Sequence, residues 1–260
     1  MHLNFVKSGR GPVVVLAHAL GCDLSMWDEV AAALEPQFTV LRYDMRGHGR
    51  SDVPPPPYSI ELLAEDAAAL ITEHVGGPVH FVGLSMGGMV AQMLAARRPE
   101  LVRSIVVGMS SSYYDDSYRS AWNARIDAVL THGMRSVADG AIQRWFTPEF
   151  RRSEAGARRA AAARAVLEAT DARAYAACCQ AISRIEFCKT NPAIWCPTLV
   201  VAGARDEATP PAMSEAIRDS ISGAQLVTLD TAHLGAVEKP REFAALVSRF
   251  LQGTPARQPA

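Results

Sequence analysis

The sequence predicts an α/β fold in which a mostly parallel central sheet is flanked by helices. Short apolar runs rich in Val and Ile alternate along the chain with amphipathic stretches. Those stretches are long enough to be crossover helices, which return the chain for another parallel strand. The 260 residues are 49% hydrophobic, with 26 basic and 27 acidic side chains. This composition is that of an ordinary globular protein and excludes disordered, coiled-coil and collagen-like structures.

Each predicted strand is a short apolar run, and each predicted helix has apolar residues at helical spacing. The expected strands are residues 12–17, 38–43, 79–83, 104–109, 198–203 and 225–229. The expected helices between and after them are residues 60–74, 87–98, 212–220 and 240–251.

The alternation stops between Ser110 and Thr190, where the sequence contains no convincing strand and includes an Ala/Arg-rich stretch. An insertion after the carboxyl end of a strand lies over the region where open α/β sheets bind ligands. We therefore expect a helical lid (cap) at residues 111–190, between two parts of one core at residues 1–110 and 191–260. A helical decoration without a role in the site is the alternative.

Charge and local composition exclude several classes of function. A formal net charge of −1 without runs of like charge gives no reason to expect nucleic acid or an anionic membrane as a partner. No apolar stretch is long enough for a signal peptide or a membrane span, so the cytoplasm is the expected location. The five cysteines lack CxxC spacing and suit reduced core thiols. Neither a metal nor a cofactor is expected, and an oligomer is possible.

The strongest local motif is Gly83-Leu84-Ser85-Met86-Gly87, which lies between an expected strand and an expected helix. This is the GxSxG nucleophile elbow in the context that it requires. The glycines are needed because larger side chains would collide where the strand reverses into the helix. The motif predicts that Ser85 is a nucleophile presented to a cleft.

A serine hydroxyl needs a base that is oriented by a third group. Asp206 follows the strand at residues 198–203, and His233 follows the strand at residues 225–229. The carboxyl ends of parallel strands meet at one edge of the sheet, so we predict a triad of Ser85, Asp206 and His233.

Other residues could fill the same roles. Asp115 or Asp116, after the strand that ends at Met109, is the alternative to Asp206 as the acid. His48 lies in the loop Arg46-Gly47-His48-Gly49, which is more typical of a structural turn than of a catalytic base.

Acyl transfer also needs hydrogen-bond donors for the developing oxyanion. The N–H of Met86, directly after the nucleophile, supplies one donor. The loop after the strand at residues 12–17 supplies the other, and by position we choose Leu20. His18 is expected to buttress this loop and to contribute to substrate binding.

The sequence resembles the α/β-hydrolase superfamily, most closely the 3-oxoadipate enol-lactonases. The matching segments are residues 20–27, 41–49 and 83–88, the insertion motif Arg144-Trp145-Phe146-Thr147, and residues 208–210. Family members usually have two strands before the one at Val13. Only residues 3–7 fit a strand here, so the first strand is expected to be shortened or missing.

The resemblance implies a serine hydrolase that opens a small anionic enol lactone to 3-oxoadipate, through an acyl-enzyme or an activated water. Because the net charge is close to zero, the acetate arm needs a placed cation. We choose Arg144 for this role and Trp145 as a wall of the pocket.

Three rival functions share the predicted fold. The first two are a general carboxylesterase and a hydrolase that cleaves a carbon–carbon bond in a ring-fission product, which the triad alone does not separate. The third is a ligand-binding receptor that keeps the hydrolase fold, against which the complete triad argues.

Overall fold

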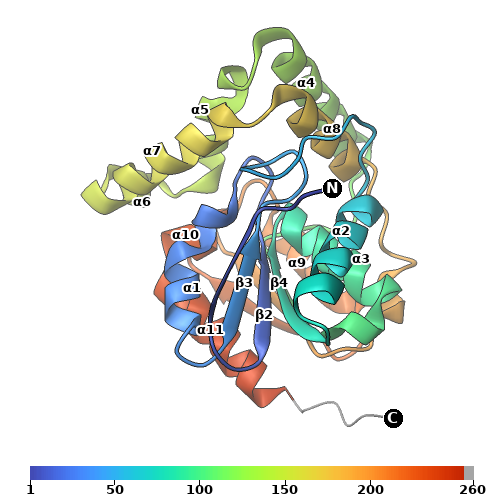
Figure 1. Cartoon of the computed structure of the whole chain (residues 1–260). Helices are drawn as coiled ribbons and strands as arrows, with labels where there is room; N and C mark the ends of the chain where they lie inside the picture. Colours follow the sequence, from blue (N-terminus) through green and yellow to red (C-terminus); the bar gives the residue numbers. More distant parts are fainter. Residues whose placement is uncertain (255–260) are drawn as a thin grey trace.

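The computed structural model describes residues 1–254, so the last six residues of the expected 191–260 segment lie outside the described part. Its centre is a seven-stranded sheet in the order β1-β3-β2-β4-β5-β6-β7, in which only β1 runs antiparallel to its neighbour (Figure 1). The strands are β1 (Phe5–Gly9), β2 (Val13–Ala17), β3 (Thr39–Tyr43), β4 (Val79–Leu84), β5 (Val102–Gly108), β6 (Thr198–Gly203) and β7 (Gln225–Leu229). The predicted class, a mostly parallel sheet, is confirmed.

The inner strands of the sheet are more deeply buried than the two edge strands. Every residue of β4 and β6 is buried, whereas β1 and β7 contain exposed residues. A parallel sheet covered on both faces produces continuous apolar runs of this kind, which is why these strands could be recognised from the sequence. A single strand, β1, precedes β2. It lies two residues later than the expected residues 3–7, because its pairing with β3 continues to Gly9.

Helices cover both faces of the sheet. Helices α1 (Asp28–Leu34) and α11 (Pro240–Gly253) contact each other on one side, and α2 (Ile60–His74) and α3 (Met86–Arg97) lie together on the other (Figure 1). Helix α9 (Pro211–Ser220) contacts β6 and β7, and the short helix α10 (Gly235–Glu238) precedes α11. Three 3₁₀ turns connect these elements, η1 (Leu24–Trp27), η2 (Pro99–Leu101) and η3 (Asn191–Ala193). The sequence did not predict α1, which is too short to establish a helical period.

The segment between β5 and β6 is helical. It consists of α4 (Asp116–His132), α5 (Arg135–Trp145), α6 (Pro148–Arg152), α7 (Glu154–Ala169) and α8 (Ala172–Ser183). These helices gather at one end of the sheet (Figure 1). A β-bridge between Tyr113 and Glu186 joins the two ends of the insertion where it leaves the core.

Three of the five cysteines lie in the buried core. Cys22, Cys178 and Cys179 are free and buried, as expected. Cys188 is exposed in the connection from α8 to β6, so the expectation of a core thiol is wrong for this residue. Cys196 is half-buried and packs against the hydrophobic core. Within residues 1–254, no helix is both long and apolar enough to cross a membrane.

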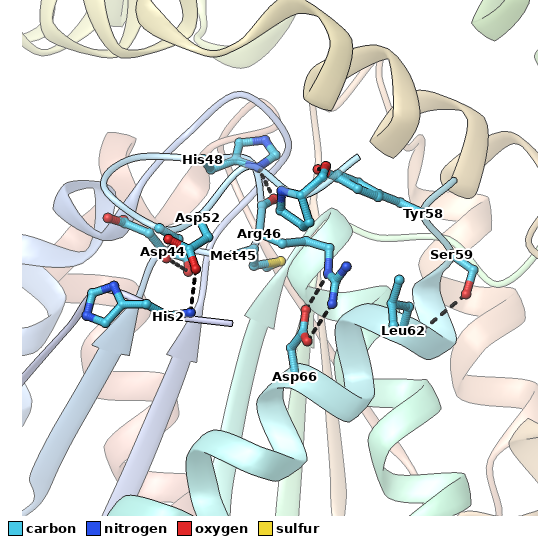
Figure 2. Close-up of polar contacts among 12 residues, drawn as sticks. His2, Asp44, Met45, Arg46, His48, Asp52, Tyr58, Ser59, Leu62 and Asp66 are labelled. Atoms are coloured by element: carbon cyan, nitrogen blue, oxygen red, sulfur yellow. Dashed lines mark hydrogen bonds and ion pairs between the residues drawn. The ribbon is translucent and has the colours of Figure 1, made fainter. Parts of the chain in front are cut away.

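The loop from β3 to α2 is fixed by buried polar contacts. Arg46 forms two hydrogen bonds of 2.5 and 2.6 Å with the carboxylate of Asp66 on α2 (Figure 2). The buried Asp44 carboxylate accepts hydrogen bonds from the N–H groups of Leu24 and Arg50. These contacts connect the loop to α2 and to the segment that follows β2.

Two buried histidines link this loop to the segment after β2. His18 Nε2 accepts a hydrogen bond of 2.9 Å from the Met45 N–H, and His48 Nε2 accepts one of 3.1 Å from the Gly21 N–H. The other ring nitrogen of each faces a backbone carbonyl, that of Ala19 and that of Arg46 respectively. A ring that accepts at one nitrogen and donates at the other is neutral. Burial accordingly lowers the pKa of His18, and burial together with the nearby His18 lowers the pKa of His48 to about 3.

The low pKa of His48 predicts a loss of stability in acid. Between the ordinary value of 6.5 and about pH 3, the unfolded chain binds a proton at His48 that the folded protein does not bind. The free energy of unfolding therefore falls as the pH falls, by up to about 1.4 kcal/mol per pH unit for this histidine. His48→Asn should make the slope shallower by about 1 kcal/mol per unit in urea-unfolding curves recorded between about pH 6 and pH 4. The exposed His132, changed to Asn, is the control, and an unchanged slope in His48→Asn would contradict the assignment.

Candidate active site

Ser85 lies in the turn between β4 and α3, with a backbone conformation that few residues adopt. Its φ is 56° and its ψ is −115°, outside the main allowed regions for a residue with a side chain. The turn is held on both sides, because the Ser85 N–H donates to the Gly108 carbonyl at 2.8 Å and the Ser110 hydroxyl donates to the Ser85 carbonyl at 2.8 Å. Strain of this kind persists only where the surroundings over-determine it, and it is common at functional sites.

The two glycines of the motif are required by close approach of backbone to backbone. A Cβ atom on Gly83 would lie 1.9 Å from the Gly87 carbonyl oxygen. A Cβ atom on Gly87 would lie 2.1 Å from the carbonyl oxygen of Ala17 at the end of β2. The Gly87 N–H also donates to the His18 carbonyl at 3.1 Å. The start of α3 therefore lies directly against the segment that follows β2.

Asp206 and His233 lie together at the carboxyl ends of β6 and β7. His233 Nδ1 is 2.8 Å from Asp206 Oδ2, and both side chains are buried. Thr209 supports the pair, since its hydroxyl donates to Asp206 Oδ2 at 2.7 Å and its N–H donates to Oδ1 at 3.0 Å. The Ala208 N–H donates to the same Oδ1 at 2.8 Å.

This environment keeps Asp206 ionised. Burial alone would raise the pKa of its carboxyl group, but His233 and the hydrogen bonds from Thr209 outweigh burial and hold the pKa below its usual value of 3.8. A carboxylate facing Nδ1 fixes the tautomer in which Nδ1 carries the proton, so Nε2 is free to accept one. The pair thus has the arrangement of a base and its orienting acid.

The alternative acids and base have other places in the structure. Asp115 accepts a hydrogen bond from the Tyr118 N–H and caps α4, and the exposed Asp116 pairs with Arg119. Both ring nitrogens of His48 contact backbone groups. None of these three residues contacts the Asp206–His233 pair.

The segment after β2 leaves one backbone donor available. The N–H groups of Ala19, Gly21 and Cys22 donate to Met26 Sδ, His48 Nε2 and the Ala19 carbonyl respectively. Within the described part of the chain, the Leu20 N–H alone among these four residues has no acceptor. Met86 is the first residue of α3, where an N–H has no carbonyl partner inside the helix. These are the two donors that the sequence predicted for the oxyanion.

A cavity of about 240 Å³ brings most of the predicted residues together. Its lining includes Leu20, Ser85 and His233 from the core, and Arg144 and Trp145 from α5. The sequence missed the rest of the lining from the insertion, which consists of Tyr114, Tyr118, Ala121, Trp122, Arg125, Ala141 and Tyr175. The spacing of residues 118, 122 and 125 on one helical face could have indicated some of them, but α4 has only one fully buried residue, so its apolar period is weak.

One predicted substrate contact, His18, needs correction. Its side chain is fully buried, both ring nitrogens contact backbone groups, and it does not line the cavity. Its Nε2 instead accepts the hydrogen bond from the Met45 N–H in the β3–α2 loop. His18 supports the loop that carries Leu20, the other role that the sequence suggested.

A second cavity, of about 230 Å³, lies apart from this arrangement, between α7 and the core beside Cys22 and Arg159, and neither Ser85 nor His233 lines it. Among the residues that the structure describes, no group of three or more His, Cys, Asp or Glu side chains is placed to hold a metal ion.

Hydrogen bonds connect the insertion to the segment that contains His233. The Glu238 carboxylate accepts hydrogen bonds from the Thr147 hydroxyl, the Thr147 N–H at 3.3 Å and the Ala232 N–H at 3.1 Å. The Leu234 N–H donates to the Trp145 carbonyl at 2.9 Å. Trp145, a wall of the cavity, is therefore positioned by the residues on either side of His233.

Comparison with known proteins gives a consistent result. The family model for the alpha/beta hydrolase fold matches residues 12–240. The chain is 33% identical to 3-oxoadipate enol-lactonase 2 of Acinetobacter baylyi, over 95% of this chain and 94% of that protein. Its structure is similar to that of an enol-lactonase from Burkholderia xenovorans, with a TM-score of 0.92, 35% identity and 96% of each chain covered. It is also similar to a thermophilic esterase from Thermogutta terrifontis, with a TM-score of 0.91, 27% identity and 98% and 94% of the chains covered.

The close approach at Gly87 predicts a cost for any side chain there. Gly87→Ala should lower the free energy of unfolding by about 1–3 kcal/mol, because a backbone carbonyl cannot move aside as a flexible side chain can. Gly77→Ala is the matched control, since a Cβ atom there meets nothing within 4 Å. Chemical denaturation of both variants checks this, and equal stability of the two would contradict the close approach.

Proposed function

This chain belongs to the α/β-hydrolase family and is a lactone or ester hydrolase, and on that premise we propose that it opens 3-oxoadipate enol-lactone to 3-oxoadipate. One observation carries the proposal: the cavity lined by Ser85 and His233 is also lined by Arg144, a cationic residue. The substrate would be a small five-membered enol lactone with an acetate arm, so a nucleophile, a base and a cation are the groups it needs. The enol-lactonases among the relatives support this choice.

In the proposed first step, Ser85 Oγ attacks the lactone carbonyl carbon while His233 Nε2 accepts the hydroxyl proton. Asp206, held ionised at 2.8 Å from Nδ1, stabilises the imidazolium that forms. The carbonyl oxygen becomes an oxyanion and accepts hydrogen bonds from the Leu20 and Met86 N–H groups. Such donors are effective because they are in place before the charge develops.

Collapse of this intermediate breaks the bond between the acyl carbon and the ring oxygen. The ring oxygen leaves as an enol, protonated by His233, and remains tethered to the acyl group on Ser85. A water molecule then attacks the acyl carbon while His233 accepts its proton, which releases a carboxylate and restores the Ser85 hydroxyl. The enol rearranges to the ketone of 3-oxoadipate. In an alternative path, His233 activates water for direct attack and Ser85 is not acylated.

We assign two residues of α5 to the substrate. Arg144 would pair with the carboxylate of the acetate arm, and Trp145 would form an apolar wall against the ring. The insertion at residues 111–190 would act as a lid, since it supplies most of the residues that line the cavity of Ser85.

A carboxylesterase is the second candidate function, favoured by the likeness to the thermophilic esterase. Its predicted chemistry uses the same triad and oxyanion donors, so only the substrate separates the two. A cleft specific for an anionic lactone should discriminate strongly against neutral aryl esters.

The proposed nucleophile predicts the outcome of Ser85→Ala. Hydrolysis of enzymatically generated 3-oxoadipate enol-lactone, followed by loss of its absorbance, should fall by a factor of up to about 10⁶ in kcat. Ser117→Ala, at an exposed serine on α4, should retain the full rate. If the wild type ignores the lactone but cleaves aryl esters through Ser85, the esterase replaces the lactonase as the function.

The Glu238 contacts predict a loss of rate from a variant that touches no substrate. Glu238→Ala removes the oxygen that accepts from the Thr147 and Ala232 N–H groups, so Trp145 and His233 should lose their relative placement. We expect kcat/KM to fall by about tenfold, since small misplacements of reacting groups have large effects. Glu149→Ala, which loses an exposed pair between the insertion and Arg205, should change kcat/KM less than twofold. Equal effects in the two variants would contradict a positioning role for Glu238.

A further inference from the structure

One face of α4 presents a second arginine to the cavity. Tyr118, Trp122 and Arg125 line it together, at the spacing that places residues on one side of a helix. The Arg125 guanidinium lies over the Trp122 ring, 4.6 Å from its centroid. This contact holds a long cationic side chain against an aromatic surface inside the cavity.

Arg125 and Arg144 reach the same space from different helices. Both line the cavity of about 240 Å³, Arg125 from α4 and Arg144 from α5. Burial lowers the pKa of Arg144, and the positive charge of Arg125 lowers it further. Two cations that repel each other in a small cavity favour the binding of an anion between them.

The cavity lacks a paired counter-charge for these arginines. Other arginines of the insertion form ion pairs, such as Arg158 with Glu154 and Arg164 with Asp139. Over residues 1–254, no carboxylate lies within ion-pair distance of Arg125 or Arg144. Glu207 also lines the cavity and acts on Arg144 at longer range.

Tyr175 on α8 lines the cavity near Arg125. Burial raises the pKa of Tyr175, so its hydroxyl is neutral, and the nearby charge of Arg125 acts in the opposite direction. A guanidinium has five N–H donors in a fixed plane, so the contact of Arg125 with the Trp122 ring face leaves donors for a ligand.

We propose that Arg125 is a specificity-determining residue that binds the substrate carboxylate together with Arg144. The inference rests on the proposed function for the identity of the substrate, and it extends the anion site from α5 to α4. Two guanidinium groups supply planar donors on two sides of a carboxylate, whereas a neutral ester in the same place would leave both cations without a partner.

The test uses Arg125→Met, which keeps the length of the side chain and removes its charge. Arg119→Met is the matched control, because Arg119 lies on the same helix, pairs with Asp116 and does not line the cavity. Binding of adipate, a six-carbon dicarboxylate, and of adipamide, its neutral counterpart, is measured by calorimetry for both variants and the wild type. KM and kcat for the enol lactone and for 4-nitrophenyl acetate are measured in parallel.

We expect Arg125→Met to weaken adipate binding and to raise KM for the lactone, each by about 10–100-fold. Adipamide binding and kcat on 4-nitrophenyl acetate should change less than twofold, and Arg119→Met should behave as the wild type. The proposal is overturned if Arg125→Met binds adipate normally, if Arg119→Met loses binding equally, or if the wild type binds no adipate. If the wild type binds adipate through Arg125 but does not open the lactone, the result supports this anion site and contradicts the proposed function.

Discussion

The backbone contact between the start of α3 and the end of β2 is the constraint on which the rest of the site depends. Gly87 can approach the Ala17 carbonyl only because it has no Cβ atom, and this approach brings Met86 beside the segment that contains Leu20. The same turn forces Ser85 into its strained conformation at the end of β4. This one steric condition therefore places the proposed nucleophile and both proposed oxyanion donors. Hydrogen bonds of His18 and His48 connect the Leu20 segment to the β3–α2 loop.

The site contains two separate groups of charges, the Asp206 carboxylate and the two arginines Arg125 and Arg144. Beneath the cavity, Asp206 is ionised and its oxygens accept hydrogen bonds from Thr209, Ala208 and His233, so its negative charge is already stabilised before any reaction. Inside the cavity, Arg125 and Arg144 are cations without a paired carboxylate in the described residues. The negative charge of Asp206 suits a base that must become transiently positive. The positive charges of Arg125 and Arg144 suit a negatively charged ligand. The helical insertion supplies both arginines, and Glu238 connects this insertion to the segment that contains His233.

The sequence predicted the features that depend on neighbouring residues and missed those that depend on distant ones. Continuous apolar runs revealed the buried strands, and Ser59, whose hydroxyl caps α2, fits the start of the helix predicted from residue 60. The elbow could be recognised because its five residues are contiguous between a strand and a helix, although Gly87 is required by a contact with the distant Ala17 carbonyl. Arg125 and Tyr175 could not be found in this way, since they meet only when α4 and α8 fold over the sheet. His18 was expected both to buttress the loop after β2 and to bind substrate, yet the direction of its ring depends on Met45, 27 positions away along the chain.

The central claim is that the strained turn and the Asp206–His233 pair make Ser85 an activated nucleophile. The most direct measurement is covalent labelling with a small fluorophosphonate, followed by peptide mass spectrometry of the wild type and of His233→Ala. The account predicts one stoichiometric adduct, on the peptide that contains Ser85, formed at least about a hundred times more slowly without His233. An adduct on another residue, or labelling of Ser85 at the same rate in both proteins, would contradict it.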